Sequence, residues 1–287
     1  MLTGVTRSAA TDLVAAGAVI VDGAAVTRGA DRLAAGQTLQ IALPEETGSD
    51  PPAAQSEVVV PVVFEDEHVV VVDKPADLVV HPGAGNDQGT LVNGLLARYP
   101  ELASVGDATD PVRPGIVHRL DKGTSGLLVV ARSLQAHESL VAQLATRSVE
   151  RRYRTLVWGH PDSNRGVVDA PIGRSTRQPT RMAVTAGGKE ARTSYEVVEL
   201  FDEPAPLALL TCRLETGRTH QIRVHLSAIG HPVVGDDRYH GWRESLPCPR
   251  PFLHAEHLAF DHPATGLRVG FDSALPDDLL GVLGHLV

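Results

Sequence analysis

A polar loop leads directly into an apolar run in the stretch His118-Arg119-Leu120-Asp121-Lys122-Gly123-Thr124-Ser125-Gly126-Leu127-Leu128-Val129-Val130-Ala131-Arg132. The run from Leu127 onward has the length and apolar character of a buried strand. Gly123 and Gly126 allow the loop before it to turn tightly. A strand on one side of this loop would hold Asp121 in a fixed position. The stretch therefore predicts a loop on a rigid scaffold that displays one carboxylate.

The carboxylate of Asp121 is flanked in the sequence by Arg119 and Lys122. These two cations would keep it ionised at neutral pH. An ionised carboxylate is suited to act as a nucleophile or a base rather than as a proton donor. The alternative is that Asp121 only caps a turn or pairs with Arg119, which is the common role of a loop aspartate. The loop by itself leaves both interpretations open.

The chain has 287 residues, of which 43% are hydrophobic, so it can form one large domain or a large and a small domain. Its apolar runs, such as residues 69–72, are short enough for strands and too short to cross a membrane. The N-terminal residues show no apolar segment typical of a signal peptide. We expect a cytoplasmic protein without membrane spans.

The cysteines and histidines show no spacing typical of a cofactor site. Cys212 and Cys248 lie far apart, which argues against a disulfide framework and against a zinc site. His220, His225 and His231 have no companion carboxylates at a known metal-ligand spacing. We therefore expect neither a metal nor another cofactor.

The charge of the chain is unevenly distributed. The net charge of −9 argues against a nucleic-acid partner. However, residues 44–73 carry eight acidic and no basic residues, whereas residues 147–223 carry thirteen basic and nine acidic residues. All the basic residues of the second segment except Lys189 are arginines, which suit phosphate contacts and stacking on bases. RNA remains a possible partner despite the acidic total.

Three segments differ in composition. Residues 1–43 are expected to form a helix over 6–17, a hairpin of residues 19–21 and 24–26 around the turn Asp22-Gly23, and a strand over 38–43. Residues 44–57 are rich in proline, alanine and acidic residues without periodicity, which predicts a flexible linker. The catalytic domain is expected to span residues 58–287.

Hydrophobic periodicity predicts the main elements of this larger domain. The expected strands cover residues 58–60, 62–64, 69–72, 127–132, 151–159, 194–200 and 207–214. The expected helices cover residues 90–99 and 133–148, and the second would bury Leu134, Leu140, Val141 and Leu144. Residues 215–226 are expected to pass from a strand into a helix that Thr216 or Thr219 caps.

Two motifs resemble those of the RluA/RluC/RluD family of pseudouridine synthases. They are the loop 118–126 and Gly217-Arg218-Thr219-His220-Gln221-Ile222-Arg223. The resemblance covers roughly residues 58–287 and is closest to the RluD-type enzymes of large-subunit ribosomal RNA. It implies an α+β catalytic domain on a mixed, largely antiparallel sheet. Residues 1–43 resemble part of the small RNA-binding domain known from ribosomal protein S-four.

The resemblance also implies roles for individual residues. Asp121 would be the catalytic carboxylate, and an arginine of the second motif would pair with it. We favour Arg218 and keep Arg223 as the alternative, because the spacing does not decide between them. Tyr153 would lie against the target base, where an aromatic ring contributes roughly 1–3 kcal/mol of stacking.

Further contacts with the RNA are expected from polar residues in and near these motifs. They are His118, Arg119, Lys122, Arg174, Thr219, His220 and Arg223, with Lys74 and His81 as candidates that have equally plausible structural roles. The matching segments 230–236 and 252–255 are expected to be architectural and to take no part in the chemistry.

The implied reaction converts uridine to pseudouridine in structured RNA, with large-subunit ribosomal RNA favoured and transfer RNA as the alternative. Asp121 would act as a nucleophile on the ribose or base, or as a base that removes a ribose proton to form a glycal. A glycosidase is a rival from another class and requires a second carboxyl group within ~5–10 Å of Asp121. An RNA-binding protein in which Asp121 is only structural is the third interpretation. The protein is expected to be a monomer.

Overall fold

The structure is a computed structural model that describes residues 13–14, 17–26, 34, 36–41, 51–83, 86–106 and 112–287. The chain divides into two compact units, residues 1–50 and 51–287. In the smaller unit, β1 (Val19–Val21) pairs with both β2 (Ala24–Ala25) and β3 (Leu39–Ile41), each in the antiparallel direction. The predicted hairpin and third strand are confirmed.

Most of the predicted helix over 6–17 lies outside the described residues, although Leu13 and Val14 are helical. The three arginines of the smaller unit, at positions 7, 28 and 32, also lie outside them. At the hairpin turn, Asp22 and Gly23 have φ values of 50° and 85°, as a two-residue hairpin turn requires. The Asp22 carboxylate also accepts a hydrogen bond from the Thr38 amide at 2.8 Å, which links the turn to the start of β3.

The larger unit is built on a nine-stranded sheet with the order β4-β5-β6-β13-β7-β12-β11-β8, and β14 pairs with β13. Its strands are β4 (Val62–Glu65), β5 (Val69–Lys74), β6 (Ser125–Ala131), β7 (Glu150–Trp158), β8 (Arg165–Asp169), β11 (Arg192–Phe201), β12 (Leu207–Leu214), β13 (Leu253–Asp261) and β14 (Arg268–Asp272). The β6–β13 pair is parallel, and the other pairs of this sheet are antiparallel. The predicted α+β fold with a mixed, largely antiparallel sheet is confirmed.

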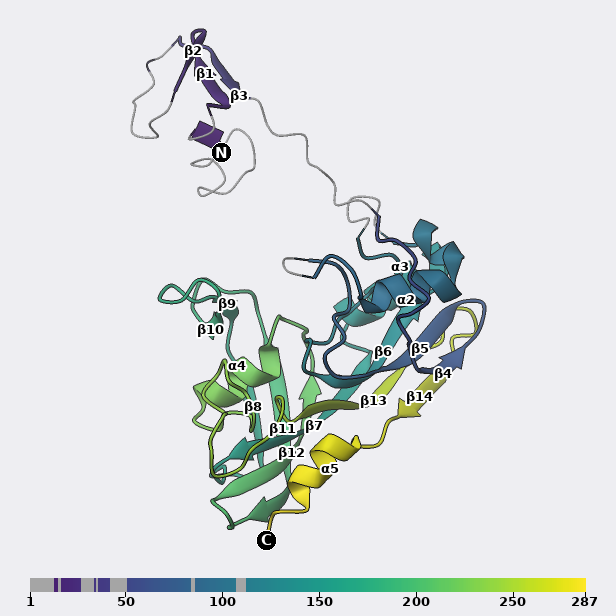
Figure 1. Ribbon diagram of the computed structural model, residues 1–287, viewed down its shortest axis with the longest axis vertical. Helices are drawn as coiled ribbons and strands as arrows, with labels where there is room; N and C mark the ends of the chain where they lie inside the picture. Colours follow the sequence, from purple (N-terminus) through teal and green to yellow (C-terminus); the bar gives the residue numbers. More distant parts are fainter. Residues whose placement is uncertain are drawn as a thin grey trace. The chain divides into compact units, whose positions relative to one another are not determined.

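Short helices and a small hairpin surround this sheet (Figure 1). The helices are α2 (Leu91–Arg98), the 3₁₀ helix η1 (Pro100–Ser104), α3 (Leu134–Ala145), α4 (Gln221–Ala228) and α5 (Asp277–Leu283). The hairpin consists of β9 (Ile172–Arg174) and β10 (Met182–Val184). Figure 1 shows α2 and α3 near the end of the sheet formed by β4, β5 and β6, and α4 and the hairpin near the end formed by β8 and β11.

Strands β5 and β6 are apolar without interruption because both faces of the sheet are covered there. Successive side chains of a strand point to opposite faces. The odd-numbered residues of both strands join α3 in one apolar cluster, and the even-numbered residues join α2 in the other. The first cluster contains Val69, Val71, Leu127, Val129 and Leu140, and the second contains Val70, Val72, Leu128, Val130 and Leu95.

The structure differs from the sequence-based expectation at the start of the larger unit. Residues 58–60 form no strand, although they are apolar. The segment before them instead bonds to α2, where the Gln55 amide donates to Asn93 O at 2.9 Å and Asn93 Nδ2 donates to Ala53 O at 2.7 Å. Residues 51–57, which were assigned to the linker, therefore belong to the larger unit.

Helix α3 buries a narrower stripe than predicted. Leu140 is fully buried, but Leu134 and Val141 are exposed. The helix contacts the sheet through positions spaced four residues apart, Ala136, Leu140 and Leu144. Leu134 and Val141 lie outside this row and point to solvent although they are apolar.

Candidate active site

Lys74 anchors the loop that carries Asp121. Lys74 is fully buried at the end of β5, and its Nζ donates to Pro75 O at 2.8 Å, Leu78 O at 2.9 Å and Lys122 O at 3.3 Å. Burial lowers the pKa of its ammonium group to about 7, while the charge of Asp121 acts in the opposite direction. Lys74, a candidate for RNA contact, therefore has a structural role in this geometry.

The other end of the loop is fixed by the segment that precedes β13 and by the C-terminal helix. Arg250 Nη1 donates to Gly123 O at 3.0 Å, and the carboxylate of Asp278 in α5 accepts from Arg250 Nε at 2.6 Å and Nη2 at 3.0 Å. Gly126 has a φ of 111°, and a Cβ at this position would lie 2.4 Å from Ala255 O. Only glycine fits where β6 begins to pair with β13.

Asp121 pairs with Arg223, and a second carboxylate holds Arg223 in place. Arg223 Nη1 donates to Asp121 Oδ2 at 3.0 Å. Its Nε and Nη2 donate to the two oxygens of the fully buried Asp236 at 2.6 and 2.9 Å. Burial acts to lower the pKa of Arg223, but the hydrogen bond from Asp236 and the charges of both carboxylates raise it above its ordinary value. Arg223 is thus a permanent cation.

The preference for Arg218 as the partner of Asp121 was wrong. Arg218 is exposed, and its Nε donates to Glu190 O at 2.9 Å. The physical reason is the start of α4 at Gln221, because Arg223 lies in the first helical turn and Arg218 lies in the turn before the helix. The Arg218 amide donates a hydrogen bond to Gln221 Oε1 at 3.0 Å, which fixes that turn.

His220 begins α4 in an unusual backbone conformation. It is the N-cap residue with a φ of 57°, and neither Thr216 nor Thr219 caps the helix as expected. Left-handed non-glycine residues cost roughly 1–3 kcal/mol and are concentrated at functional sites. His220 Nε2 lies 4.0 Å from Asp121 Oδ1, and Nδ1 lies 2.8 Å from the Tyr239 hydroxyl. Burial lowers the pKa of His220 against the effect of the Asp121 charge, which favours the neutral ring.

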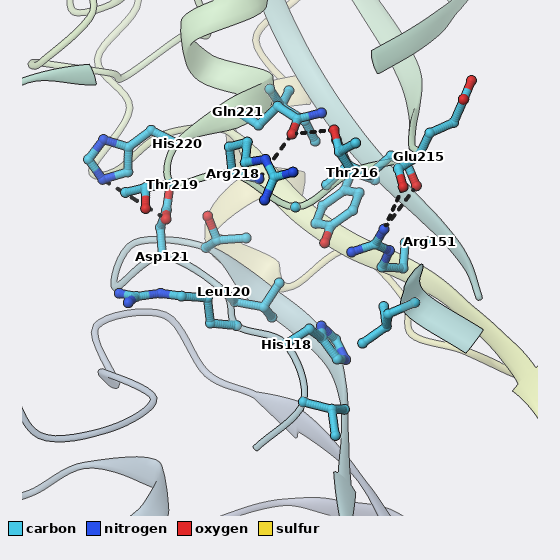
Figure 2. Close-up of a pocket in the computed structure, with 18 of the residues that line it drawn as sticks. His118, Leu120, Asp121, Arg151, Glu215, Thr216, Arg218, Thr219, His220 and Gln221 are labelled. Atoms are coloured by element: carbon cyan, nitrogen blue, oxygen red, sulfur yellow. Dashed lines mark hydrogen bonds and ion pairs between the residues drawn. The ribbon is translucent and has the colours of Figure 1, made fainter. Parts of the chain in front are cut away.

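Asp121 opens onto a first cavity of about 550 Å³. Figure 2 shows Asp121 and His220 on one side of this cavity and Arg151 and Glu215 on the other. Tyr153 reaches the cavity from β7, is almost fully buried, and has a pKa that burial raises above its ordinary value. The cavity therefore combines a carboxylate with an aromatic wall.

His118 lines the same cavity but is bonded to the scaffold. Its Nε2 accepts the Val129 amide at 3.2 Å, and burial lowers the pKa of its ring to about 3. The neutral ring thus links the loop to β6. Thr219 is exposed and also lines this cavity.

A second cavity of about 1170 Å³ meets the first at Asp121. Lys122, Arg119 and Arg238 bring positive charge to it, and Trp242 forms part of its wall. Arg119 Nη1 donates to His81 Nε2 at 3.1 Å, so a histidine considered for RNA contact orients an arginine of the loop.

Arg174 is the predicted contact that the structure does not bring to the site. It lies on β9, is exposed, and donates from Nη1 to Pro179 O at 3.1 Å. It belongs to the lining of neither cavity.

Asp236 and Tyr239 are part of the site, although the segment 230–236, which ends at Asp236, was expected to be architectural. Besides binding Arg223, Asp236 Oδ1 accepts the Tyr239 amide at 3.1 Å, and the Arg223 guanidinium carbon lies 5.2 Å from the Tyr239 ring centroid. A carboxylate two positions after the apolar pair 233–234 was the available signal, because a buried acid needs a charged partner.

Two further features concern the part of the chain that the structure describes. In it, no three His, Cys, Asp or Glu side chains gather closely enough to hold a metal ion. Likewise, no described helix is both long enough and apolar enough to cross a membrane. Both cysteines, Cys212 and Cys248, are buried free thiols.

Comparison with known proteins identifies relatives of this chain. Residues 68–228 match the family model described as RNA pseudouridylate synthase. The chain is 46% identical over 283 residues to ribosomal large subunit pseudouridine synthase D of Pseudomonas aeruginosa, covering 94% of this chain and 84% of that protein. It is 46% identical over 252 residues to the protein of the same name from Zymomonas mobilis, covering 84% and 76%. Among solved structures, human RNA pseudouridylate synthase domain containing 1 aligns with a TM-score of 0.60 and 30% identity, over 77% of this chain and 86% of that chain.

Proposed function

Because this chain belongs to the RNA pseudouridylate synthase family, we propose that it isomerises uridines of large-subunit ribosomal RNA with Asp121 as the catalytic carboxylate. The isomerisation breaks the bond between N1 and C1′, turns the uracil and joins C5 to C1′. The C5 proton is lost, and N1 carries a proton in the product. No oxidant or other reactant is consumed.

The observation that carries this proposal is the position of Asp121 where the two cavities meet. Arg223 binds one of its oxygens, Oδ2, at 3.0 Å. This bond orients the carboxylate and places a cation directly beside it, where the ribose of the bound uridine would lie. Such a carboxylate is equipped for either the nucleophilic or the glycal route.

The first cavity would receive the target uridine. The nucleotide must leave its stack to reach an enclosed carboxylate, which costs a few kcal/mol and is easier in RNA loops. The ring of Tyr153 supplies a surface against which the detached uracil is retained while it turns. Retention matters because the uracil is not covalently attached to the ribose at that stage.

The rivals from other classes are less well supported. A glycosidase needs a second carboxyl group that is free to exchange a proton. Two further carboxylates line the first cavity, but Glu190 pairs with Arg147, and Glu215 pairs with Arg147 and Arg192. The other carboxylate at Arg223, Asp236, is fully buried and accepts hydrogen bonds from Arg223, Arg238 and Tyr239. A purely structural Asp121 would not need the oriented arginine at the junction of two cavities.

The RNA class is proposed from the names of the relatives, which are synthases of the large ribosomal subunit. The small N-terminal unit, which resembles part of the S-four domain, would add affinity for structured RNA. We further propose a division into that unit, a short connection and a catalytic domain, and action as a monomer in the cytoplasm. Transfer RNA is the competing substrate class.

The test is release of tritium from RNA transcribed with 5-tritiated uridine, using ribosomal and transfer RNA in parallel. We expect the native protein to release tritium from large-subunit ribosomal RNA and Asp121→Asn to release none, while both bind the RNA equally. Release by Asp121→Asn at the native rate would refute the catalytic role. Release from transfer RNA alone would replace the proposed substrate class.

A further inference from the structure

We propose that Trp242 is a stacking platform for an unpaired nucleotide that neighbours the target uridine, and that the second cavity is the subsite for this nucleotide. The inference rests on the proposed function, because it places an RNA chain at Asp121. A uridine in the first cavity has neighbours on the same strand. The second cavity shares five lining residues with the first, Asp121 among them, and is the larger of the two.

The two tryptophans of the chain have opposite environments. Trp158 is 1% exposed, its Nε1 donates to Gly241 O at 2.7 Å, and the Arg243 guanidinium lies 4.2 Å from its ring centroid. Trp242 is 56% exposed and lines the second cavity. Tryptophan normally buries most of its large apolar surface. An exposed indole in a cavity beside a reactive carboxylate is therefore a candidate ligand surface.

The backbone that presents Trp242 is rigid. The Gly241 amide donates to Asp236 O at 2.7 Å, and Gly241 O accepts the Gly235 amide at 3.0 Å. A Cβ at position 241 would lie 1.6 Å from Val233 O, so the chain is tightly packed immediately before Trp242. A platform on a fixed backbone loses little conformational entropy when it binds a base.

The same loop is connected to the catalytic carboxylate. It carries Asp236, which binds Arg223 through two hydrogen bonds, and Arg223 binds Asp121. The position of Trp242 relative to Asp121 is therefore set by a short series of charged contacts. This gives the subsite a fixed distance from the reacting nucleotide.

The charge of the second cavity favours nucleic acid over an apolar peptide. Besides Trp242, the lining holds more basic than acidic residues: Arg119, Lys122, Arg223, Arg238 and Arg250 against Asp77, Asp121 and Asp237. Cations that follow a phosphate backbone, combined with an aromatic ring for the bases, are the usual elements of single-stranded RNA sites. Stacking does not depend strongly on base identity, so this subsite would select an unpaired base rather than a particular one.

Intrinsic fluorescence provides the first test, because Trp158 is buried and Trp242 is the exposed tryptophan. RNA that the native protein modifies should quench the emission and protect it from acrylamide. In Trp242→Phe the RNA-dependent change should disappear, although the RNA still binds. An equal change in Trp242→Phe would assign the signal to Trp158 and overturn the proposal.

Steady-state kinetics provide the second test. Loss of one base stack corresponds to a KM for RNA raised roughly 5- to 150-fold in Trp242→Ala, with kcat changed less than about twofold. Trp242→Phe should stay near the native KM. Leu267→Ala is the matched control, because Leu267 is also an exposed apolar side chain but lines neither cavity. An unchanged KM in Trp242→Ala would refute the platform.

An abasic nucleotide distinguishes stacking from other effects of the mutation. Removing the base next to the target should raise the KM of the native protein but have little further effect in Trp242→Ala. The proposal would be overturned if an abasic nucleotide at every neighbouring position raised the KM of Trp242→Ala as much as it raises the KM of the native protein. If the native protein releases no tritium from any RNA, the proposed function fails first. If it does and these three measurements show no effect, only the subsite fails.

Discussion

The loops that carry Asp121 and Asp236 place two carboxylates on one guanidinium, but only one of them faces a cavity. The Asp236 side chain is 0% exposed, and donors from Arg223, Arg238 and Tyr239 surround its oxygens. The Asp121 side chain is 17% exposed and has one close side-chain donor, Arg223. A carboxylate with saturated acceptors stabilises structure, whereas one with free acceptor capacity toward a cavity is available for chemistry.

Asp121→Asn should give the largest effect on activity with little effect on stability. We expect turnover to fall at least about 10²–10⁴-fold, the range for losing a positioned acid–base group. The melting temperature should change little, because the side chain is partly exposed and Asn can still accept from Arg223. Tritium release and thermal denaturation measure the two effects. Loss of folding together with activity would mean that the two carboxylates are not functionally distinct.

In Asp236→Asn the main effect should be a loss of stability. Weakening a buried ion pair leaves the Arg223 cation incompletely compensated, and removing a partner from such a pair costs about 3–5 kcal/mol. For a domain of this size that corresponds to a fall in melting temperature of roughly 6–20 °C. Circular dichroism at increasing temperature measures it. A melting temperature equal to that of Asp121→Asn would contradict the comparison.

A smaller effect, on the pH dependence of stability, is expected from Lys74, which holds the Asp121 loop in place. Burial lowers the pKa of Lys74 from 10.5 in the unfolded chain to about 7 in the folded protein. Between these values the unfolded chain binds more protons, so the free energy of unfolding should rise with pH. The expected gain from about pH 6.5 to 8.5 is about 1–2 kcal/mol, measured by urea denaturation.

Lys74→Met provides the control for this pH dependence. The mutation removes the titrating group. The free energy of unfolding should therefore no longer increase over this pH range, whatever the mutation does to the absolute stability. The same rise in Lys74→Met would assign the pH dependence to another group.

The smallest effect should follow from Arg218→Ala. Its guanidinium is exposed and bonds Glu190 O rather than Asp121. We expect kcat to change less than about threefold, since loss of exposed contacts usually costs under ~0.5 kcal/mol. Arg223→Ala is the matched comparison and should lower kcat far more. A larger loss in Arg218→Ala would restore the assignment that the geometry argues against.

The sequence alone predicts what depends on local pattern. The apolar runs of β5 and β6 identify two strands that are buried on both faces, and the loop motif identifies Asp121. The choice between Arg218 and Arg223 depends on the residue at which α4 begins, and that start is a left-handed histidine that no helix propensity predicts. The site therefore depends on one backbone conformation that the pattern does not contain.

Other features that the sequence did not predict have the same physical origin. The valines at 58–60 have strand-like composition, but the Val58 amide donates to Gln55 O, and the Gln55 amide donates to Asn93 O in α2. Arg250 stabilises the Asp121 loop through Gly123, which lies 127 positions earlier in the chain. Contacts at such separations leave no local signal in the sequence.

The close contact between Gly126 and Ala255 restricts which residue of β6 can lie beside β13. Because β6 is apolar on both faces, a slip by one residue would exchange its two sets of side chains without exposing either to water, and burial alone opposes such a slip weakly. The slip would nevertheless move Asp121 about 3.3 Å along the strand and away from Arg223. Any other residue brought opposite Ala255 would collide with its carbonyl oxygen. The glycine at position 126 thus protects the register of β6 against insertions and deletions earlier in the chain.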